Sequence, residues 1–381
     1  MPSWMSHWGR ICTAGSLAGL FLLAGCGQFF PPLSSGSGGS SGSGTASGDY
    51  LYVGNSETTN IAGFSIASSA LSTLSGSPWA ASLGPTALAV TPNDSYLYLG
   101  SNAGEIYVYT IASNGAITLG NGGVPVAGIS AGVLRVDTTG KYLLVATGFS
   151  GQVSVYQIGS GGTLTAISSS VVTLNSNIAA TDMEISPSDD YVYVSCATAG
   201  IYTMSFDSGT GALAQVNSVL APKQADAADY GMAISPSGSY LFAAETVTGG
   251  VRVFSIGTNG TLTETSGSPY TTGTGAYSVL VDSTGSYVYV ANRTQKNISA
   301  FLLSGTGALT AISGSPFTTG ALPVGMVEDK TDTYIAVICN GGGPDLQVFT
   351  FAGSTAGALT SFKSTTTGTD PTEASSIAAT H

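Results

Sequence analysis

Short stretches in which apolar side chains alternate with other residues recur along the chain from Tyr50 onward. The stretch Tyr287–Thr333 shows the pattern in full, because it opens with Tyr287-Val288-Tyr289-Val290 and continues with apolar segments at 298–303, 308–312 and 324–328. Polar or Gly-rich turns separate these segments. Alternation with a period of two is that of β-strands, whose successive side chains point to opposite faces. The stretch therefore predicts a unit of four short strands.

The same unit occurs seven times. Its first tyrosine recurs at spacings of 46, 46, 49, 49, 47 and 47 residues, at Tyr50, Tyr96, Tyr142, Tyr191, Tyr240, Tyr287 and Tyr334. A fixed period in the forties with four strands per unit is typical of a β-propeller. We therefore predict an all-β fold with one domain over residues 50–381, a seven-bladed β-propeller with four antiparallel strands per blade.

The first unit lacks an inner strand of its own. The chain enters the repeat at Tyr50 with what is the second strand of a blade, and the C-terminal segment 371–377 resembles residues 84–88, which open an inner strand elsewhere. An open sheet edge favours pairing with other chains. We therefore expect the C-terminal strand to join the N-terminal blade and close the ring.

The first 49 residues differ in composition from the repeats. An apolar run at 11–23, too short to span a bilayer, ends in Leu23-Ala24-Gly25-Cys26, which resembles the bacterial lipobox. This resemblance implies a lipoprotein signal peptide at 1–25 and lipidation of Cys26; the alternative is an ordinary signal peptide that happens to contain a cysteine. Residues 26–49 are then the lipidated cysteine and a Gly/Ser-rich linker. We expect a cell-envelope location outside the cytoplasm, on a periplasm-facing membrane or the cell surface.

Charge narrows the choice of partners. Only 8% of residues are charged, and the net charge of -12 leaves nine Lys and Arg in the whole chain. Nucleic acids and anionic membrane surfaces are bound by clustered cations, so neither is an expected partner of the folded domain. We expect a monomer that contacts the membrane only through its lipid anchor. Cys196 and Cys339 lie in repeats 4 and 7, too far apart around the ring for a disulfide, and should be free thiols.

Candidate functional residues lie in the loops that follow the second strand of each unit. Most of these loops consist of Gly, Ser, Thr and Asn. Glu245 and Arg293 are exceptions that follow the tyrosines of consecutive repeats by five and six residues. We therefore expect them to project from adjacent blades into the same mouth of the ring.

Around these two residues the chain resembles the seven-bladed β-propeller lactonase family, which includes the propeller-type 6-phosphogluconolactonases. Ala244-Glu245-Thr246 is similar to that family's N-E-L loop, and Asn292-Arg293-Thr294-Gln295 is similar to its N-R-G-H loop. The resemblance implies hydrolysis of a sugar or other small lactone. Glu245 would be the base that activates water and Arg293 would stabilise the oxyanion. The predicted substrate contacts are Asn292, Gln295 and Asn340.

The chain also departs from the family's pattern. Gln295 stands where the family has His, and the chain's two histidines are His7 and His381. Arginines, which bind phosphate through paired donors, are scarce. An unphosphorylated or weakly charged lactone is therefore the expected substrate. Two alternatives stay open: Glu245 and Arg293 form an interblade salt bridge, or the protein is a non-catalytic surface propeller that binds a glycan, peptide or partner protein.

Other charged residues have a structural interpretation. Arg135 and Glu184 occupy the same inner-strand position in consecutive units, seven residues before the tyrosine, and should form an interblade ion pair. Asp182, Lys223, Asp226 and Asp229 make a polar loop region without the spacing of a calcium loop. No zinc spacing, P-loop or dinucleotide motif occurs either, so we expect no metal and no cofactor.

Overall fold

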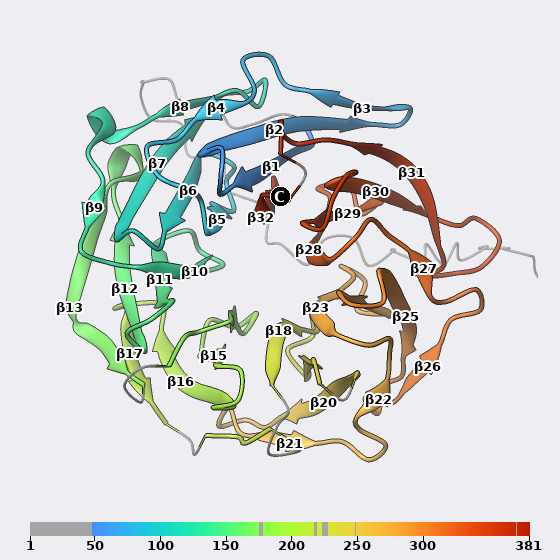
Figure 1. Ribbon diagram of the computed structural model, residues 1–381. Helices are drawn as coiled ribbons and strands as arrows, with labels where there is room; N and C mark the ends of the chain where they lie inside the picture. Colours follow the sequence, from blue (N-terminus) through green and yellow to red (C-terminus); the bar gives the residue numbers. More distant parts are fainter. Residues whose placement is uncertain (1–47, 175–177, 217–218, 223–227, 248, 371) are drawn as a thin grey trace, which may run out of the picture. The chain divides into compact units, whose positions relative to one another are not determined.

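The computed structural model describes residues 48–174, 178–216, 219–222, 228–247, 249–370 and 372–381. The predicted signal peptide, Cys26, Lys223 and Asp226 lie outside these residues. In the described part, seven antiparallel blades of four strands surround a central axis (Figure 1), which confirms the predicted propeller. No helix of this part is long and apolar enough to span a membrane.

Each blade is a meander that begins at the axis. The inner strands are β32 (Ala374–Ala379), β5 (Ala87–Val90), β10 (Ala131–Val136), β14 (Asp182–Ile185), β18 (Asp229–Ile234), β23 (Ala276–Val281) and β28 (Pro323–Glu328). The second strands are β1 (Tyr50–Asn55), β6 (Tyr96–Ser101), β11 (Tyr142–Thr147), β15 (Tyr191–Ser195), β19 (Tyr240–Glu245), β24 (Tyr287–Asn292) and β29 (Tyr334–Cys339). Each begins at a predicted tyrosine.

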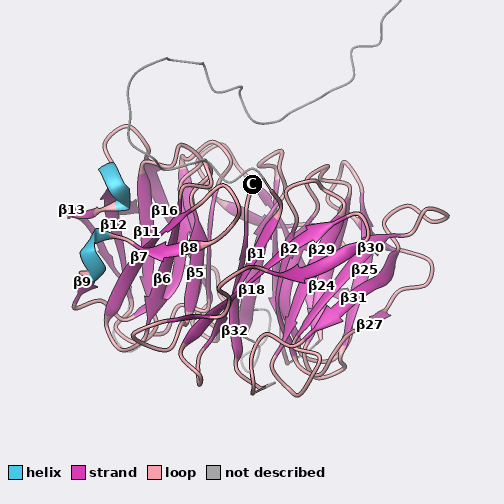
Figure 2. Ribbon diagram, turned by 90° about the horizontal axis from the view of Figure 1, so that it is seen from above, coloured by secondary structure: helices cyan, strands magenta, loops and turns pink. Residues whose placement is uncertain are grey.

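The outer half of each blade contains two further strands. The third strands are β2 (Asn60–Ala67), β7 (Glu105–Ile111), β12 (Gln152–Ile158), β16 (Ile201–Asp207), β20 (Gly250–Ile256), β25 (Asn297–Leu303) and β30 (Leu346–Phe351). The fourth are β3 (Ala70–Thr73), β8 (Ile117–Leu119), β13 (Leu164–Thr173), β17 (Ala212–Gln215), β21 (Leu262–Glu264), β26 (Leu309–Ala311) and β31 (Leu359–Thr365). Because the strands alternate in direction, the loops gather on the two faces of the ring (Figure 2).

Four two-residue strands add to this plan where the sequence predicted only loops. They are β4 (Trp79–Ala80), β9 (Val126–Ala127), β22 (Tyr270–Thr271) and β27 (Phe317–Thr318), and each pairs with the start of the third strand of its own blade. Each follows a proline directly. Two residues are too few to show a period of two, so the sequence pattern could not reveal them.

Tyrosines of the second strands form hydrogen bonds between neighbouring blades. The Tyr52 side chain is fully buried, and its hydroxyl donates to the carbonyl oxygen of Gly115 in the outer hairpin of the next blade, at 2.8 Å. Tyr193 and Gly260 repeat this contact at 3.1 Å. Gly260 has φ +73°, and a Cβ there would collide with the Tyr191 ring. The turn dipeptides and the tyrosines thus stabilise the same seam between blades.

The ring closes through the two ends of the propeller. Strand β32 pairs antiparallel with β1, with Val53 opposite Ile377, and the two strands lie side by side in Figure 1. This confirms the predicted closure. The edge of β1 that faces the axis is thereby covered.

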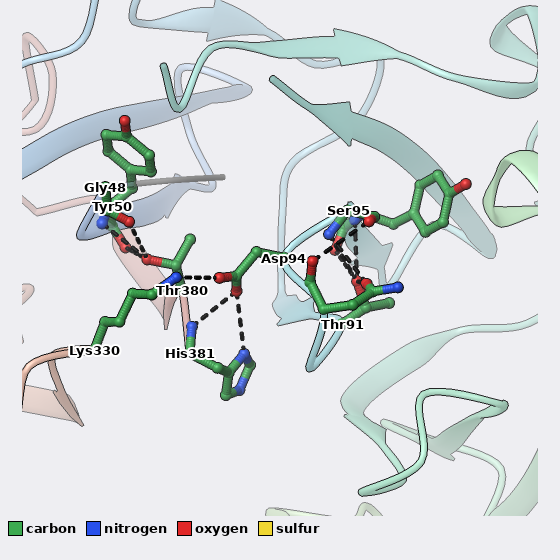
Figure 3. Close-up of polar contacts among 10 residues, drawn as sticks. Gly48, Tyr50, Thr91, Asp94, Ser95, Lys330, Thr380 and His381 are labelled. Atoms are coloured by element: carbon green, nitrogen blue, oxygen red, sulfur yellow. Dashed lines mark hydrogen bonds and ion pairs between the residues drawn. The ribbon is translucent and has the colours of Figure 1, made fainter. Parts of the chain in front are cut away.

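The C-terminal residue contacts Asp94 in a turn of blade 2, and the same carboxylate is bonded to a turn of blade 7. The Asp94 carboxylate, which is 2% exposed, accepts hydrogen bonds from Lys330 Nζ at 2.7 Å and from the His381 backbone N–H at 2.8 Å (Figure 3). Asp94 lies between β5 and β6, and Lys330 lies between β28 and β29. Asp94 therefore connects the end of the strand that completes blade 1 with blades 2 and 7.

The two cysteines of the propeller are free and buried, as the sequence predicted. Burial raises the pKa of both Cys196 and Cys339 to about 12. A thiol at this pKa is protonated at neutral pH and is a poor nucleophile. Both cysteines act as small apolar side chains of their strands.

Candidate functional site

The inner strands of all seven blades enclose a cavity of about 390 Å³ on the ring axis. Among the residues described as lining it, the charged ones are Arg135, Asp182 and Glu184. The lining also contains two large polar-tipped aromatic side chains, Tyr230 and Tyr277. Most of the remaining wall is aliphatic or small. Ligand sites are commonly apolar cavities that contain a few convergent polar groups, so this cavity is the candidate site.

The three charged side chains form one cluster. Arg135 contacts Asp182 Oδ1 at 2.7 Å and Glu184 Oε1 at 3.0 Å through the same guanidinium nitrogen. The period of two places both carboxylates on one face of β14, opposite the arginine of β10. Asp182 Oδ2 also accepts the backbone N–H of Met232 at 2.8 Å, which connects the cluster to β18. The predicted interblade pair of Arg135 and Glu184 is confirmed.

The cluster combines a permanent cation with a carboxyl group that titrates near neutral pH. Burial raises the pKa of Glu184 to about 7, although the attraction of Arg135 opposes the rise. Burial on its own would lower the pKa of Arg135, but Glu184 and Asp182 more than offset this and raise it. Groups that exchange protons near pH 7 are suited to general acid–base chemistry.

The two tyrosines stand at the mouth of the cavity, where inner strands β18 and β23 begin. Their ring centroids are 5.1 Å apart and the rings are tilted by 32°. The Arg293 guanidinium carbon lies 5.2 Å from the Tyr277 ring centroid, a cation–π contact. Burial raises the pKa of Tyr277, and Arg293 partly opposes the rise. Tyr277 is therefore a neutral hydroxyl donor at physiological pH.

Residues 48–375 match the sequence model of the protein family described as Lactonase, 7-bladed beta-propeller. The chain belongs to this family. No curated protein matches the chain significantly.

Solved structures agree with the lactonase-family fold. A Pseudomonas aeruginosa periplasmic gluconolactonase superimposes with a TM-score of 0.73 at 15% identity, covering 87% of this chain and 99% of its own. A Bacteroides fragilis protein, a candidate 6-phosphogluconolactonase, gives a TM-score of 0.72 at 18% identity, covering 88% of this chain and 99% of its own. A Lactobacillus plantarum protein gives a TM-score of 0.71 at 19% identity, covering 88% of this chain and 100% of its own. At these identities the likeness concerns the fold alone.

Within this lactonase-family propeller, Glu245 and Arg293 have different surroundings. Glu245 ends β19 with 0% exposure and pairs across the sheet with Asp229, whose carboxylate contacts Arg252 at 3.1 Å. It does not line the cavity. Arg293 is partly exposed and lies on Tyr277, which does line the cavity. The prediction that both residues project into one mouth therefore fits Arg293 better than Glu245.

The three predicted substrate contacts are placed mainly in loop-stabilising positions. Asn292 is 0% exposed, and its Nδ2 donates to Asn297 Oδ1 at 2.7 Å and to Ser299 Oγ at 2.9 Å. The Gln295 side chain accepts the backbone N–H of Thr274 at 3.0 Å. The Asn340 backbone N–H donates to the Leu322 carbonyl at 3.0 Å. None of the three lines the cavity, so their role as ligands stays a prediction.

The sequence analysis did not identify the tyrosine pair, although a signal exists. Tyr230 and Tyr277 each lie ten residues before the tyrosine that opens the second strand of their blade. That position lines the cavity in every blade. Comparing one inner-strand position across the repeats would therefore have identified both. Across the described part of the chain, no group of three or more His, Cys, Asp or Glu residues is arranged to hold a metal.

Proposed function

We propose that the protein is a lipid-anchored lactonase of the cell envelope that hydrolyses a small unphosphorylated lactone in the axial cavity. The observation that carries this proposal is the cluster of Glu184, Asp182 and Arg135 inside that cavity. It places a carboxyl group with a pKa of about 7 and a cation within one ligand-sized cavity. Membership of the lactonase family supports the same reaction class.

Glu184 is the proposed base. It takes a proton from a water molecule, whose oxygen attacks the lactone carbonyl carbon to form a tetrahedral oxyanion. Arg135 stabilises this oxyanion, because a fixed cation is most effective where negative charge develops. When the ring C–O bond breaks, the leaving alkoxide takes the proton back from Glu184. The product is a hydroxy acid, and no cofactor is consumed.

Asp182 is proposed to hold Arg135 in place during this reaction. Its two oxygens are occupied by Arg135 and by the backbone N–H groups of Met183 and Met232. When Glu184 becomes protonated, Asp182 still compensates the guanidinium charge. A second carboxylate therefore keeps the arginine oriented while the first exchanges its proton.

Glu245 remains the competing base. A base has to reach a water molecule next to the substrate, and full burial outside the cavity disfavours Glu245 in that role. Arg293, at the mouth, is better placed to orient substrate than to contact a carbonyl next to Glu184. We therefore assign the proton transfer to Glu184 and keep Glu245 as the comparison variant.

A phosphorylated substrate does not fit the charges of the cavity. Its single lining arginine is already paired with two carboxylates. A phosphate dianion there would meet net negative charge, and among the described lining residues Arg135 has no second guanidinium beside it to form a paired phosphate site. The proposed substrate is therefore neutral, in keeping with a location outside the cytoplasm.

A non-catalytic binding propeller is the alternative, with a glycan, peptide or partner protein as its ligand. The observation that favours it is the pairing of Arg135 with both carboxylates, since buried charges are often paired for structural reasons alone. In that case Glu184 could be replaced without a chemical consequence.

One experiment separates these accounts. The full chain, purified in detergent, is assayed on a panel of lactones with and without a phosphate group, beside Glu184→Gln and Glu245→Gln. A loss of at least about a hundredfold in turnover with Glu184→Gln alone supports the proposal, because a general base contributes a factor of this size. Loss confined to Glu245→Gln reassigns the base. Absence of turnover above background favours the binding propeller.

The anchor has a separate test. Cells expressing the chain are labelled with a radioactive fatty acid, and Cys26→Ser is the matched variant. Label on the wild type and none on the variant supports lipidation. Equal labelling, or none on either, contradicts it.

A further inference from the structure

We propose that Asp345 and Glu373 bind a calcium-like divalent cation in the seam where blade 7 meets blade 1. Asp345 lies directly before β30 of blade 7, and Glu373 lies directly before β32, the inner strand of blade 1. The two blades are neighbours in the ring (Figure 1). Neither residue lines the axial cavity, and the inference does not depend on the lactonase proposal.

Both carboxylates are buried and incompletely paired. Asp345 is 0% exposed and Glu373 is 1% exposed. Asp345 Oδ1 and Glu373 Oε1 have no hydrogen-bond partner. In the described part of the chain, no Lys, Arg or His side chain forms an ion pair with either carboxylate. Buried carboxylates are stable when they are paired or bound to a metal, so a cation from solution would compensate both.

The residues beside Asp345 add oxygen atoms but few hydrogens. Asp345 Oδ2 accepts the backbone N–H of Thr367 at 2.9 Å. The hydroxyl oxygen of Thr367 lies 2.8 Å from Asp345 Oδ2 and 2.8 Å from Asn55 Oδ1, and its single hydrogen can serve only one of them. Ca²⁺ takes about six to eight oxygen ligands, including carboxylate and amide oxygens and water. The surplus of oxygens therefore suits Ca²⁺.

Glu373 reaches the same loop at the next residue, Gly368. A Cβ on Gly368 would collide with Glu373 Oε1 and would lie 3.3 Å from Asn55 Nδ2. The other oxygen, Glu373 Oε2, accepts the backbone N–H of Thr58 at 2.6 Å, which leaves Oε1 on the side of Gly368. The two carboxylates therefore meet the loop at consecutive residues. Such a site has two carboxylates rather than three or more acidic, His or Cys ligands.

Another seam shows that the fold does not require these carboxylates. The same Thr-Thr-Gly loop occurs between blades 5 and 6, at 271–273. Gly250 there closes the hairpin of the second and third strands, as Asp345 does in blade 7. Gly275 there directly precedes the inner strand, as Glu373 does in blade 1. The pair of carboxylates is thus an addition to the repeat at the seam that closes the ring.

A second cavity leads to the site. It has a volume of about 270 Å³, and its wall includes Asn60 and Phe64 of blade 1 and residues 366–369 of blade 7. Thr367 and Gly368, which contact the two carboxylates, belong to this wall. A metal site needs an entry path, and this cavity provides one without separation of the blades.

The bound cation joins three segments that close the ring. Asn55 ends β1, Asp345 begins the outer half of blade 7, and Glu373 leads into β32. These segments come together only in the folded chain, so the free energy of cation binding adds to the free energy of unfolding. Stability of the closed ring should therefore depend on free Ca²⁺.

The test measures cation binding and its effect on stability. The full chain is purified in detergent, treated with EDTA and titrated with CaCl₂ by isothermal titration calorimetry. Thermal melting is followed with and without Ca²⁺. The variants are Asp345→Asn and Glu373→Gln, which keep the side-chain shape and remove the charge. Glu184→Gln controls for binding in the axial cavity, and Asp207→Asn controls for loss of an exposed carboxylate at the end of β16.

We expect Ca²⁺ to bind with a Kd of about 10⁻⁴ M, in the range of extracellular calcium modules. The melting temperature should rise by several degrees when Ca²⁺ exceeds the Kd about fiftyfold. Each carboxamide variant should raise the Kd at least about tenfold, because the charge of the ligands sets the affinity, and should lose most of the rise in melting temperature. Glu184→Gln and Asp207→Asn should bind Ca²⁺ as the wild type does.

The wild type alone can reject the inference, through absence of Ca²⁺ binding after EDTA treatment. Wild-type affinity in both carboxamide variants, or loss of binding in Glu184→Gln, would also overturn it. If a carboxamide variant does not fold, Gly368→Ala takes its place, because the added Cβ fills the space beside Glu373 Oε1 and keeps both charges. Binding should weaken at least about tenfold in this variant, and unchanged affinity would contradict the site.

Discussion

The backbone N–H of Tyr50 donates to Oγ1 of Thr380 at 2.9 Å, across 330 residues of sequence. The other six blades contain the same hydrogen bond within a single turn, where the acceptor lies five residues before the tyrosine. These acceptors are Thr91, Asp137, Ser186, Ser235, Asp282 and Asp329. Thr380 is thus the seventh member of a set, supplied from the opposite end of the propeller.

Removing residues 372–381 should prevent formation of a stable monomer. The deletion removes β32, including Thr380's neighbours, and the His381 N–H that donates to Asp94. It also removes the acceptor Thr380 and exposes the edge of β1. We expect loss of the cooperative thermal transition, or oligomers in size-exclusion chromatography. A monomer that melts like the wild type would contradict the closure.

The single hydrogen bond can be tested by Thr380→Val. The substitution keeps the shape of the side chain and removes the acceptor for Tyr50 N, so the free energy of unfolding should fall by about 1 to 2 kcal/mol. Thr372→Val is the matched control, because Thr372 is exposed and bonds only to Asp370. Urea denaturation measures both. Equal stability of the two variants would show that Thr380 contributes nothing specific.

Asp94 should make the closure sensitive to acid. Burial alone would raise its pKa, but hydrogen bonds from His381 and Lys330 lower it below the usual 3.8. A carboxylate with a depressed folded-state pKa stabilises the fold above its unfolded pKa, and that stability is lost as pH falls through the folded value. Asp94→Asn should therefore lower the melting temperature at pH 6. The difference in melting temperature between this variant and the wild type should become smaller below about pH 3. A constant difference down to pH 2 would contradict this account.

Glu328 and Asp49 should have the opposite effect at alkaline pH. Burial raises the pKa of Glu328 from 4.5 to about 8 and that of Asp49 from 3.8 to about 8. Because the folded-state pKa lies above the unfolded one, the contribution of these protonated carboxyl groups to stability is fully present in acid and is lost as pH rises through 8. The melting temperature of the wild type should fall between pH 6 and pH 9, and Glu328→Gln should reduce the fall. Glu57→Gln, at an exposed position, should leave it unchanged.

Activity, where present, should follow the ionisation of the Glu184 cluster. Because the pKa of Glu184 is raised to about 7 by burial, kcat/KM for a lactone should rise with pH through this value and then level off. Glu184→Gln should abolish the dependence and leave folding intact, since Arg135 keeps its contact with Asp182. A pH profile of Glu184→Gln with the same inflection would exclude Glu184 as the base.

The period of the tyrosines was enough to predict the blades, because a hydrophobic strand repeated at a fixed interval has few ways to pack. The same reasoning placed β32 beside β1 and paired Arg135 with Glu184, since both follow from the geometry of a closed ring. Exposure was harder to predict. Glu245 follows its tyrosine by five residues and Arg293 by six. The fifth position is buried in every blade, as at Thr147 and Asn292, so the register separates two residues that the prediction had treated alike.

The pair of Tyr230 and Tyr277 was missed for a related reason. Aromatic residues are so frequent in the strands of this chain that Tyr230 and Tyr277 do not differ from core tyrosines in composition or alternation. Their place in the register separates them, because the tenth position before each repeat tyrosine faces the axis. Position within the repeat, rather than residue type, carries the functional information here.

The pairing of β1 with β32 also sets the order of events in synthesis. Strand β1 leaves the ribosome before every other strand of the propeller and waits for a partner that emerges last. Blades 2 to 7 can assemble from local neighbours, whereas blade 1 depends on one contact of very long sequence separation, which forms slowly. The ring consequently closes only after β32 has emerged, and blade 1 is the last blade to be completed.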